Sequence, residues 1–173
     1  MFRDSDDNVF PLAYLLTFRC YGTWVHGDRR GSMDRQGHNV YGTPRIAPNE
    51  KLERADAGRL KYPPVTLDTR RRATVEKAIR EVCEHRGFRL DAVNVRTNHV
   101  HAVVAAACGP EGVMTSFKSY ATRMLREDGL LSAGAKPWAR HGSTRYLWKP
   151  HHVVDAIDYV LYGQGDEPPN FDN

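Results

Sequence analysis

The sequence predicts an α+β fold, a ferredoxin-like sandwich with an antiparallel sheet and helices packed on one face of it. β-prone stretches and amphipathic helical patterns follow one another as strand, helix, hairpin, helix, a short strand and a last helix. This order gives two βαβ-like halves around one antiparallel sheet. The length of 173 residues suits one core, so we expect a single domain over residues 1–173.

The first strand is predicted over residues 10–25, which are rich in aromatic and β-prone side chains. The acidic stretch before it, 1–9, is expected to be disordered. Residues 26–66 contain several glycines and four prolines, which predict an inserted surface loop with a helical turn or more over 49–60. The tail, 165–173, carries two prolines and is expected to fray.

Three helices are predicted from the spacing of apolar residues. The first covers 69–86, with Asp68 as its N-cap and Gly87 as its stop. The second runs over 113–127, and the third runs over about 151–163. A basic, aromatic stretch with room for a short strand separates the second helix from the third.

A hairpin is predicted over residues 88–106, where Val93 and Val95 alternate with polar residues before a turn and a second apolar run follows it. Its second strand begins with His99-Val100-His101. Side chains i and i+2 share a face of a strand, so the two histidines stand side by side and Val100 points into the core. Two imidazoles on a rigid strand make a bidentate metal clamp that lacks a third ligand. The same pair also fits polar residues on a solvated face.

Composition narrows the class of protein. The formal net charge is +4 and the pI is about 9.0, which suits an acidic partner such as nucleic acid without requiring one. No apolar run is long enough to span a bilayer, and the N-terminus is too acidic for a signal peptide. Three widely spaced cysteines form no zinc pattern and suggest reduced thiols. We therefore expect a cytoplasmic protein without a membrane partner.

Three tyrosines are candidate nucleophiles for a metal site, and their positions around the helix predict different surroundings for each. At about 100° per residue, Tyr120 shares a stripe with Phe117 and is expected in or beside the core. Tyr159 is expected on roughly the opposite side of the last helix from its apolar stripe, either merely exposed or presented to a site. Tyr162 is also off the stripe and is the second choice. The predicted stripe is made of Val153, Ile157, Val160 and Leu161.

A tyrosine beside a two-histidine metal site suits phosphodiester chemistry. The metal polarises a non-bridging oxygen and steadies the leaving oxygen. The phenolate attacks phosphorus and stores the bond energy in a covalent phosphotyrosine. Such storage matters for an enzyme that rejoins DNA ends instead of hydrolysing them.

Four stretches agree with one known family: the opening 15–24, His99-Val100-His101, the stretch 117–123, and the aromatic segment 146–148 with the helix 157–160. Together they resemble the single-tyrosine HUH transposases, named for two histidines around a hydrophobic residue. More narrowly, they resemble the REP-associated tyrosine transposases and their insertion-sequence relatives. The resemblance covers about Pro11–Gly165 apart from the insertion.

The resemblance implies a domain that binds single-stranded or hairpin DNA and holds a divalent metal, Mg or Mn, on His99 and His101. It implies that Tyr159 attacks the DNA to leave a 5′-phosphotyrosine link and a free 3′-OH. Relatives place an amide side chain one helical turn after the tyrosine as a third metal ligand, where this chain has Gly163. The nearest amide is Gln164, which is either that ligand or a C-capping residue.

DNA contacts are expected from basic and aromatic side chains, because phosphates attract cations and unpaired bases stack on aromatic rings. The candidates are Arg19, Lys118, Arg123, Arg126, Arg140, Arg145 and Trp138. Each of these also fits a solvated charge or a core aromatic.

Two other functions compete with this one. Histidine-triad nucleotide hydrolases also alternate histidine with apolar residues, but the third alternating position here is Val103 and no glycine-rich phosphate loop is present. A non-catalytic, domesticated DNA-hairpin-binding protein would keep the fold and the basic face. Gly163 favours that alternative, whereas His99, His101 and Tyr159 together favour the enzyme. Relatives include monomers and dimers, so a homodimer is one of two expected states.

Overall fold

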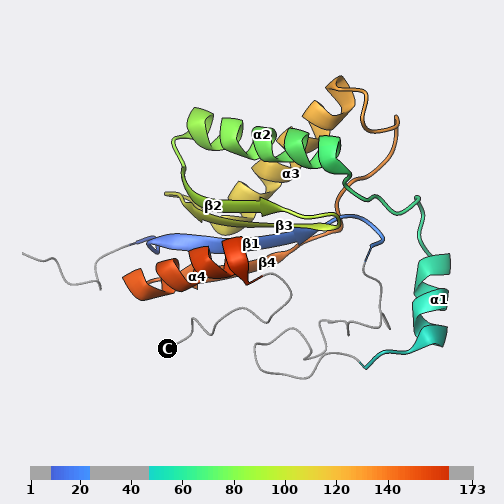
Figure 1. The fold of residues 1–173 in the computed structure, drawn as a ribbon, viewed down its shortest axis with the longest axis horizontal. Coiled ribbons are helices and arrows are strands. Elements are labelled where there is room, and N and C mark those ends of the chain that lie inside the picture. The colour runs from blue at the N-terminus through green and yellow to red at the C-terminus, as the bar shows by residue number, and fades with distance from the viewer. Residues whose placement is uncertain (1–8, 24–46, 164–173) are drawn as a thin grey trace, which may run out of the picture.

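The structure is a computed structural model that describes residues 9–23 and 47–163. It confirms the predicted α+β class and the predicted order of elements (Figure 1). The elements are β1 (Ala13–Arg19), α1 (Glu50–Gly58), α2 (Thr69–Arg86), β2 (Arg89–Val95), β3 (His99–Ala105), α3 (Pro110–Glu127), β4 (Ser143–Leu147) and α4 (Pro150–Tyr162). None of the helices in these ranges combines the length and apolar character needed to cross a membrane.

The four strands form one antiparallel sheet in the order β2-β3-β1-β4. The central pair, β1 and β3, is in a register that places Thr17 opposite His101 and Arg19 opposite His99. The register of β2 against β3 places Asn94 opposite His101 from the other side. Three neighbouring strands therefore bring polar side chains to one end of the sheet.

The helices cover both faces of the sheet, which corrects the expectation of helices on one face. Figure 1 shows α2 and α3 on one side of the sheet and α4 on the other. The cause is visible in β1, where Ala13, Tyr14, Leu15 and Leu16 are all buried, so both of its faces are apolar and need cover. Alternate residues of this run pack into two separate cores.

The larger core lies between the sheet and the pair α2–α3. In the described part of the chain it holds 19 buried residues, with Phe18, Ile79 and Phe117 among the largest. The smaller core lies under α4 and holds 7, including Leu15, Val103 and Val160. Alternate β3 side chains divide between the cores, since Val100, Ala102 and Val104 belong to the larger and Val103 to the smaller.

Helix ends follow the local sequence signals. The side chain of Asp68 accepts the backbone N–H of Arg71 at 2.9 Å, and Gly87 ends α2 with φ of 69°, so both predicted ends are confirmed. Helix α3 begins at Pro110, three residues before its predicted start, because proline fits the first turn of a helix.

Other boundaries differ more from expectation. Strand β1 is shorter than the predicted 10–25, although Cys20 extends it through a single bridge to Trp138. Helix α1 confirms the helical segment expected over 49–60, with Asn49 as its N-cap. The remainder of the predicted insertion, 26–46, and the tail, 165–173, lie outside the described residues, as do residues 1–8.

Candidate active site

His99 and His101 stand side by side on the face of β3 that looks toward α4. Their ring centroids are 4.7 Å apart, and His101 is 6% exposed while His99 is half-buried. Val100 between them packs into the larger core on the opposite face. The predicted arrangement of the pair is therefore present, and the solvated-face alternative does not describe His101.

Each histidine ring is oriented by a neighbouring side chain. Nδ1 of His101 lies 2.7 Å from Oγ1 of Thr17 on β1. Nδ1 of His99 lies 2.6 Å from Oδ1 of Asn98, an oxygen that only accepts, so this Nδ1 donates. The neutral His99 ring then carries its lone pair on Nε2. Such oxygen partners are typical of histidines that bind metals through the other ring nitrogen.

The surroundings keep His101 neutral. Burial lowers the pKa of its imidazole to about 3, and electrostatic repulsion by His99, when that ring is protonated, and by Arg19 and Arg96 adds to this effect. A neutral imidazole is the form that ligates a metal. The same two arginines make this end of the sheet electropositive, which suits a phosphate.

Tyr159 lies against this pair. Its ring centroid is 5.4 Å from that of His101, with the planes inclined at 75°. The side chain is half-buried at the edge of the smaller core. The expectation that Tyr159 lies opposite the apolar stripe is therefore wrong, because α4 is turned so that the tyrosine borders the sheet.

The buried stripe of α4 is made of His152, Ala156 and Val160. Leu161, which belongs to the predicted stripe, is instead 43% exposed. Ala156 is fully buried in the smaller core, and its small side chain suits a close approach of the helix to the sheet. Tyr162 is 82% exposed, as expected for a residue off the stripe.

The side chain of Asn94 joins α4 to the sheet. Its Nδ2 donates to the main-chain oxygen of Val160 at 2.9 Å. Because Asn94 pairs with His101 across the strands, this bond fixes the residue next to Tyr159 relative to the histidines. Tyr120, by contrast, is half-buried on α3 beside the larger core, as predicted.

In the described part of the chain the histidine pair has no third imidazole, thiol or carboxyl group beside it to complete a metal site. Among residues 9–23 and 47–163, no group of three His, Cys, Asp or Glu side chains is placed to hold a metal. Gln164, the candidate amide, lies outside the described residues. Gly163 ends α4, and a Cβ there would lie 3.1 Å from Cα of Tyr159, so glycine leaves the tyrosine uncrowded.

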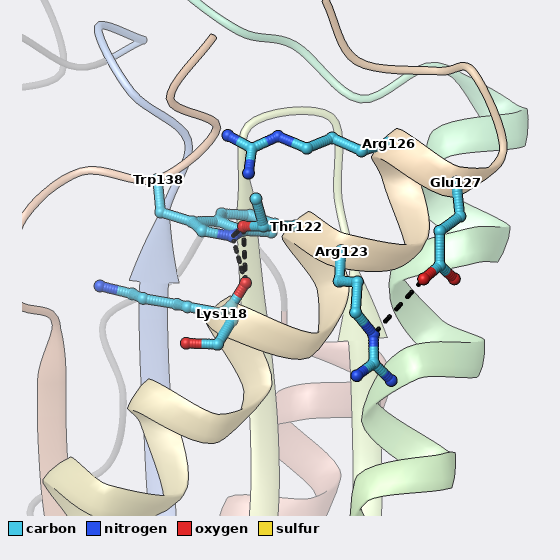
Figure 2. A pocket seen from close by; sticks show the side chains of 7 residues that line it. Lys118, Thr122, Arg123, Arg126, Glu127 and Trp138 are labelled. Carbon is cyan, nitrogen blue, oxygen red and sulfur yellow. Dashed lines mark hydrogen bonds and ion pairs between the residues drawn. The ribbon is translucent and has the colours of Figure 1, made fainter. Parts of the chain in front are cut away.

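Six of the seven candidate DNA-binding residues fall into two groups on opposite faces of the sheet. By strand alternation, Arg19 and Arg145 lie on the face of the histidines. Arg140 is exposed in the segment before β4. The other four, Lys118, Arg123, Arg126 and Trp138, line an open pocket of about 490 Å³ along α3 (Figure 2).

The contacts of the pocket residues limit what they offer a ligand. Arg123 forms an ion pair with Glu127 at 3.7 Å, which Figure 2 shows along one side of the pocket. Nζ of Lys118 donates to the main-chain oxygens of Ala139 and His141, and burial lowers the pKa of its ammonium. Lys118 therefore anchors the segment before β4.

Trp138 also serves the fold. Its Nε1 donates to the main-chain oxygen of Lys118 at 3.0 Å and to Oγ1 of Thr122 at 3.1 Å, as Figure 2 shows. Its ring packs edgewise on Phe18 in the larger core. The indole is thus already partnered on its edge and on part of its surface.

Sequence reasoning missed Thr17, Asn94, Arg96 and Asn98, which surround the histidines. Only Asn98 carried a local signal, because it directly precedes His99. Thr17 and Asn94 reach the site through strand register, and Arg96 through the turn in which its N–H donates to the main-chain oxygen of His99.

Comparison with known proteins shows the family of this chain and solved structures with a similar fold. The family model described as "Transposase IS200 like" matches residues 59–158, more than half of the chain. A search of curated protein sequences finds no significant match. A solved structure of a REP-associated tyrosine transposase bound to a REP hairpin has a similar fold, with a TM-score of 0.50 and 12% identity, over 94% of this chain and 71% of that one.

A suspected transposase from Deinococcus radiodurans R1 is also similar. Its TM-score is 0.46 at 12% identity, over 92% of this chain and 96% of that one. The match to the family model includes both histidines and reaches Asp158, directly before Tyr159. On the strength of that match, the chain belongs to the family of IS200-like transposases.

Proposed function

We propose that this protein cleaves and rejoins DNA strands as a metal-dependent transposase, through a covalent 5′-phosphotyrosine on Tyr159. The proposal rests first on the contact between the rings of Tyr159 and His101, whose centroids are 5.4 Å apart. This contact brings together two features that the chemistry requires from distant parts of the chain, a nucleophile and a metal-binding face.

The reaction exchanges one phosphodiester for another. The phenolic oxygen of Tyr159 forms a bond to phosphorus while the bond from phosphorus to the 3′-oxygen breaks. The phenol gives its proton to solvent, and the 3′-oxygen takes one up to become a free 3′-OH. The strand on the 3′ side of the break stays on the enzyme through its 5′-phosphate, and attack by a second 3′-OH reverses the step to join strands and frees the tyrosine.

His99 and His101 fit a divalent metal, Mg or Mn, because their Nδ1 atoms face side-chain oxygens and His101 is held neutral. A metal bound there would supply Lewis acidity at a non-bridging phosphate oxygen. Gln164 is the proposed third ligand, and water would fill the remaining positions.

The DNA partner is proposed to be single-stranded or hairpin DNA. Arg19 and Arg96 lie near the histidines, where they lower the pKa of His101, and they suit the phosphates beside the cleaved bond. The basic pocket along α3 is proposed to hold DNA on the other face of the sheet, through Arg126 and Arg123. The structural neighbour bound to a REP hairpin supports a hairpin as one substrate.

The test is formation of a covalent protein–DNA adduct. Purified protein is incubated with Mn and single-stranded DNA from the flanks of its own gene, including any palindrome, and the products are separated on a denaturing gel. Tyr159→Phe is compared with Tyr162→Phe, because Tyr162 lies one turn away on the same helix and is 82% exposed. Peptide mapping by mass spectrometry identifies the modified residue.

We expect an adduct on Tyr159 that chelator, Tyr159→Phe and His99→Ala each abolish, while Tyr162→Phe retains it. An adduct on Tyr162 or Tyr120 would support the proposed reaction but assign the nucleophile to that tyrosine instead of Tyr159. Hairpin binding with no adduct from any flanking sequence would identify the protein as the non-catalytic DNA binder.

A further inference from the structure

Strand β4 is an edge strand that carries two exposed aromatic rings. Tyr146 is 43% exposed, and Trp148, directly after the strand, is 44% exposed. Their ring planes are inclined by only 17°, with centroids 6.3 Å apart. In the described sheet β4 pairs with β1 alone, so no further strand flanks it on its outer side.

The pair is held in a fixed position. Tyr146 packs edgewise on the buried ring of Tyr14, with centroids 5.1 Å apart and planes inclined at 85°. The hydroxyl of Tyr14 donates in turn to the main-chain oxygen of Cys108 at 3.0 Å. A firmly held ring loses little conformational entropy when a ligand stacks on it. The two outer rings therefore form a preorganised aromatic surface.

We propose that Tyr146 and Trp148 form a stacking platform for unpaired bases of single-stranded DNA, named here the β4 platform. Every base has a flat π-face, so parallel exposed rings bind single strands with little regard to sequence. The inference rests on the proposed function, because it assumes that the protein acts on DNA. It adds a base-binding subsite on a strand that contributes neither a metal ligand nor the nucleophile.

Charge and position favour DNA as the occupant. The chain has a formal net charge of +4, and basic residues Arg145 and Lys149 adjoin the two aromatics in the sequence. By alternation along β4, Arg145 faces the side of the histidines while Tyr146 lies on the opposite side, against Tyr14. A DNA strand that passes round this edge of the sheet meets a cation on one face and stacked rings on the other.

The β4 platform, and not Trp138, is the proposed aromatic surface on which unpaired bases stack. The Trp138 indole donates to Lys118 and Thr122 and packs on Phe18, so it serves the fold. Trp148 has the exposed ring that stacking requires.

The experiment measures affinity for fluorescently labelled oligo(dT) by anisotropy, in chelator so that no cleavage occurs. Trp148→Ala is compared with Trp148→Phe, which keeps a ring, and with Tyr162→Ala, which removes an exposed aromatic elsewhere. Oligonucleotides with a single abasic position, moved along the strand, report whether a base is bound by the platform.

We expect Trp148→Ala to weaken binding by about 5- to 150-fold, the range for loss of one stacked base, and Trp148→Phe to restore most of it. Tyr162→Ala should match the wild type. At one position along the strand, an abasic site should lower the affinity of the wild type but leave the affinity of Trp148→Ala unchanged.

Equal affinity of Trp148→Ala and wild type would overturn the platform, as would an abasic effect that persists in the variant. If Trp148→Ala instead dissociates a dimer with DNA affinity unchanged, the occupant is a second copy and the inference is wrong. Failure of the proposed cleavage would appear separately, as intact binding without an adduct on Tyr159.

Discussion

The side-chain amide of Asn94 donates to the main-chain oxygen of Val160 at 2.9 Å, which ties the helix of the candidate nucleophile to the strand beside His101. Val160 lies in the last turn of α4, directly after Tyr159. The bond thus fixes the backbone next to Tyr159. It makes Asn94 a positioning residue for the proposed reaction.

Replacing Asn94 should slow adduct formation more than it weakens DNA binding. In Asn94→Leu the donor is lost at nearly constant volume, and a misplacement of Tyr159 by about 1 Å can cost on the order of 100-fold in rate. Single-turnover adduct formation and anisotropy are compared with Arg89→Ala, which breaks an exposed ion pair with Asp91 on the same strand. Equal losses of rate and affinity would assign Asn94 a structural role only.

Thr17→Val should lower metal affinity. The change removes the hydroxyl 2.7 Å from Nδ1 of His101 while keeping the shape of the side chain. Loss of such an orienting partner typically costs about 10- to 100-fold in affinity. Titration calorimetry with Mn is the measurement, and Thr144→Val on β4 is the control. Unchanged Mn affinity in Thr17→Val would show that the histidines are not the metal site or need no help from Thr17.

The burial of His101 should make the metal-free fold acid-sensitive. The pKa of His101 is lowered from 6.5 to about 3, so between those values the unfolded chain binds a proton that the folded chain does not. Stability is therefore full above about pH 6.5 and falls as pH drops through this window, by up to about 1.4 kcal/mol per pH unit. Urea unfolding in chelator at about pH 7 and pH 5 measures the loss. His101→Gln should flatten the dependence, and exposed His85→Gln should not.

Gly142→Ala should destabilise the protein. A Cβ there would lie 2.5 Å from the main-chain oxygen of Thr17 and 2.6 Å from Sδ of Met114. Overpacking of this kind costs about 1–3 kcal/mol. Gly112 in α3 has open space where a methyl group would stand, so Gly112→Ala should gain up to about 1 kcal/mol from helix propensity. Chemical denaturation compares the two, and an unchanged midpoint for Gly142→Ala would contradict the crowding.

Local signals predicted the elements well, because each has a cause within a few residues. Asp68 and Gly87 fixed both ends of α2, and the alternation around Val100 fixed the strand of the histidines. The side-by-side histidines followed from the same period of two. These features depend on hydrogen bonds and steric limits between residues that are close in the sequence.

Local sequence signals could not predict the rotation of α4 or the side chains that surround the histidines. Thr17 and His101 are 84 positions apart, and their contact exists only in one register of β1 against β3. On α4, the small Ala156 packs closely on the sheet while the larger Leu161 is exposed, so counting apolar surface gave the wrong face. Both outcomes are decided by packing between distant elements.

Because the two cores differ in size, the helices that cover them should open locally at different free-energy costs. In the described residues the layer under α4 holds 7 buried side chains against 19 under α2 and α3. Free energies of local opening follow buried contacts, so α4 should separate from the sheet at lower cost than the pair α2–α3. In hydrogen exchange its amides would lose protection before those of β1 and β3. The candidate nucleophile therefore lies on the helix that covers the smaller of the two cores, whereas the histidines lie on a central strand that both cores hold in place.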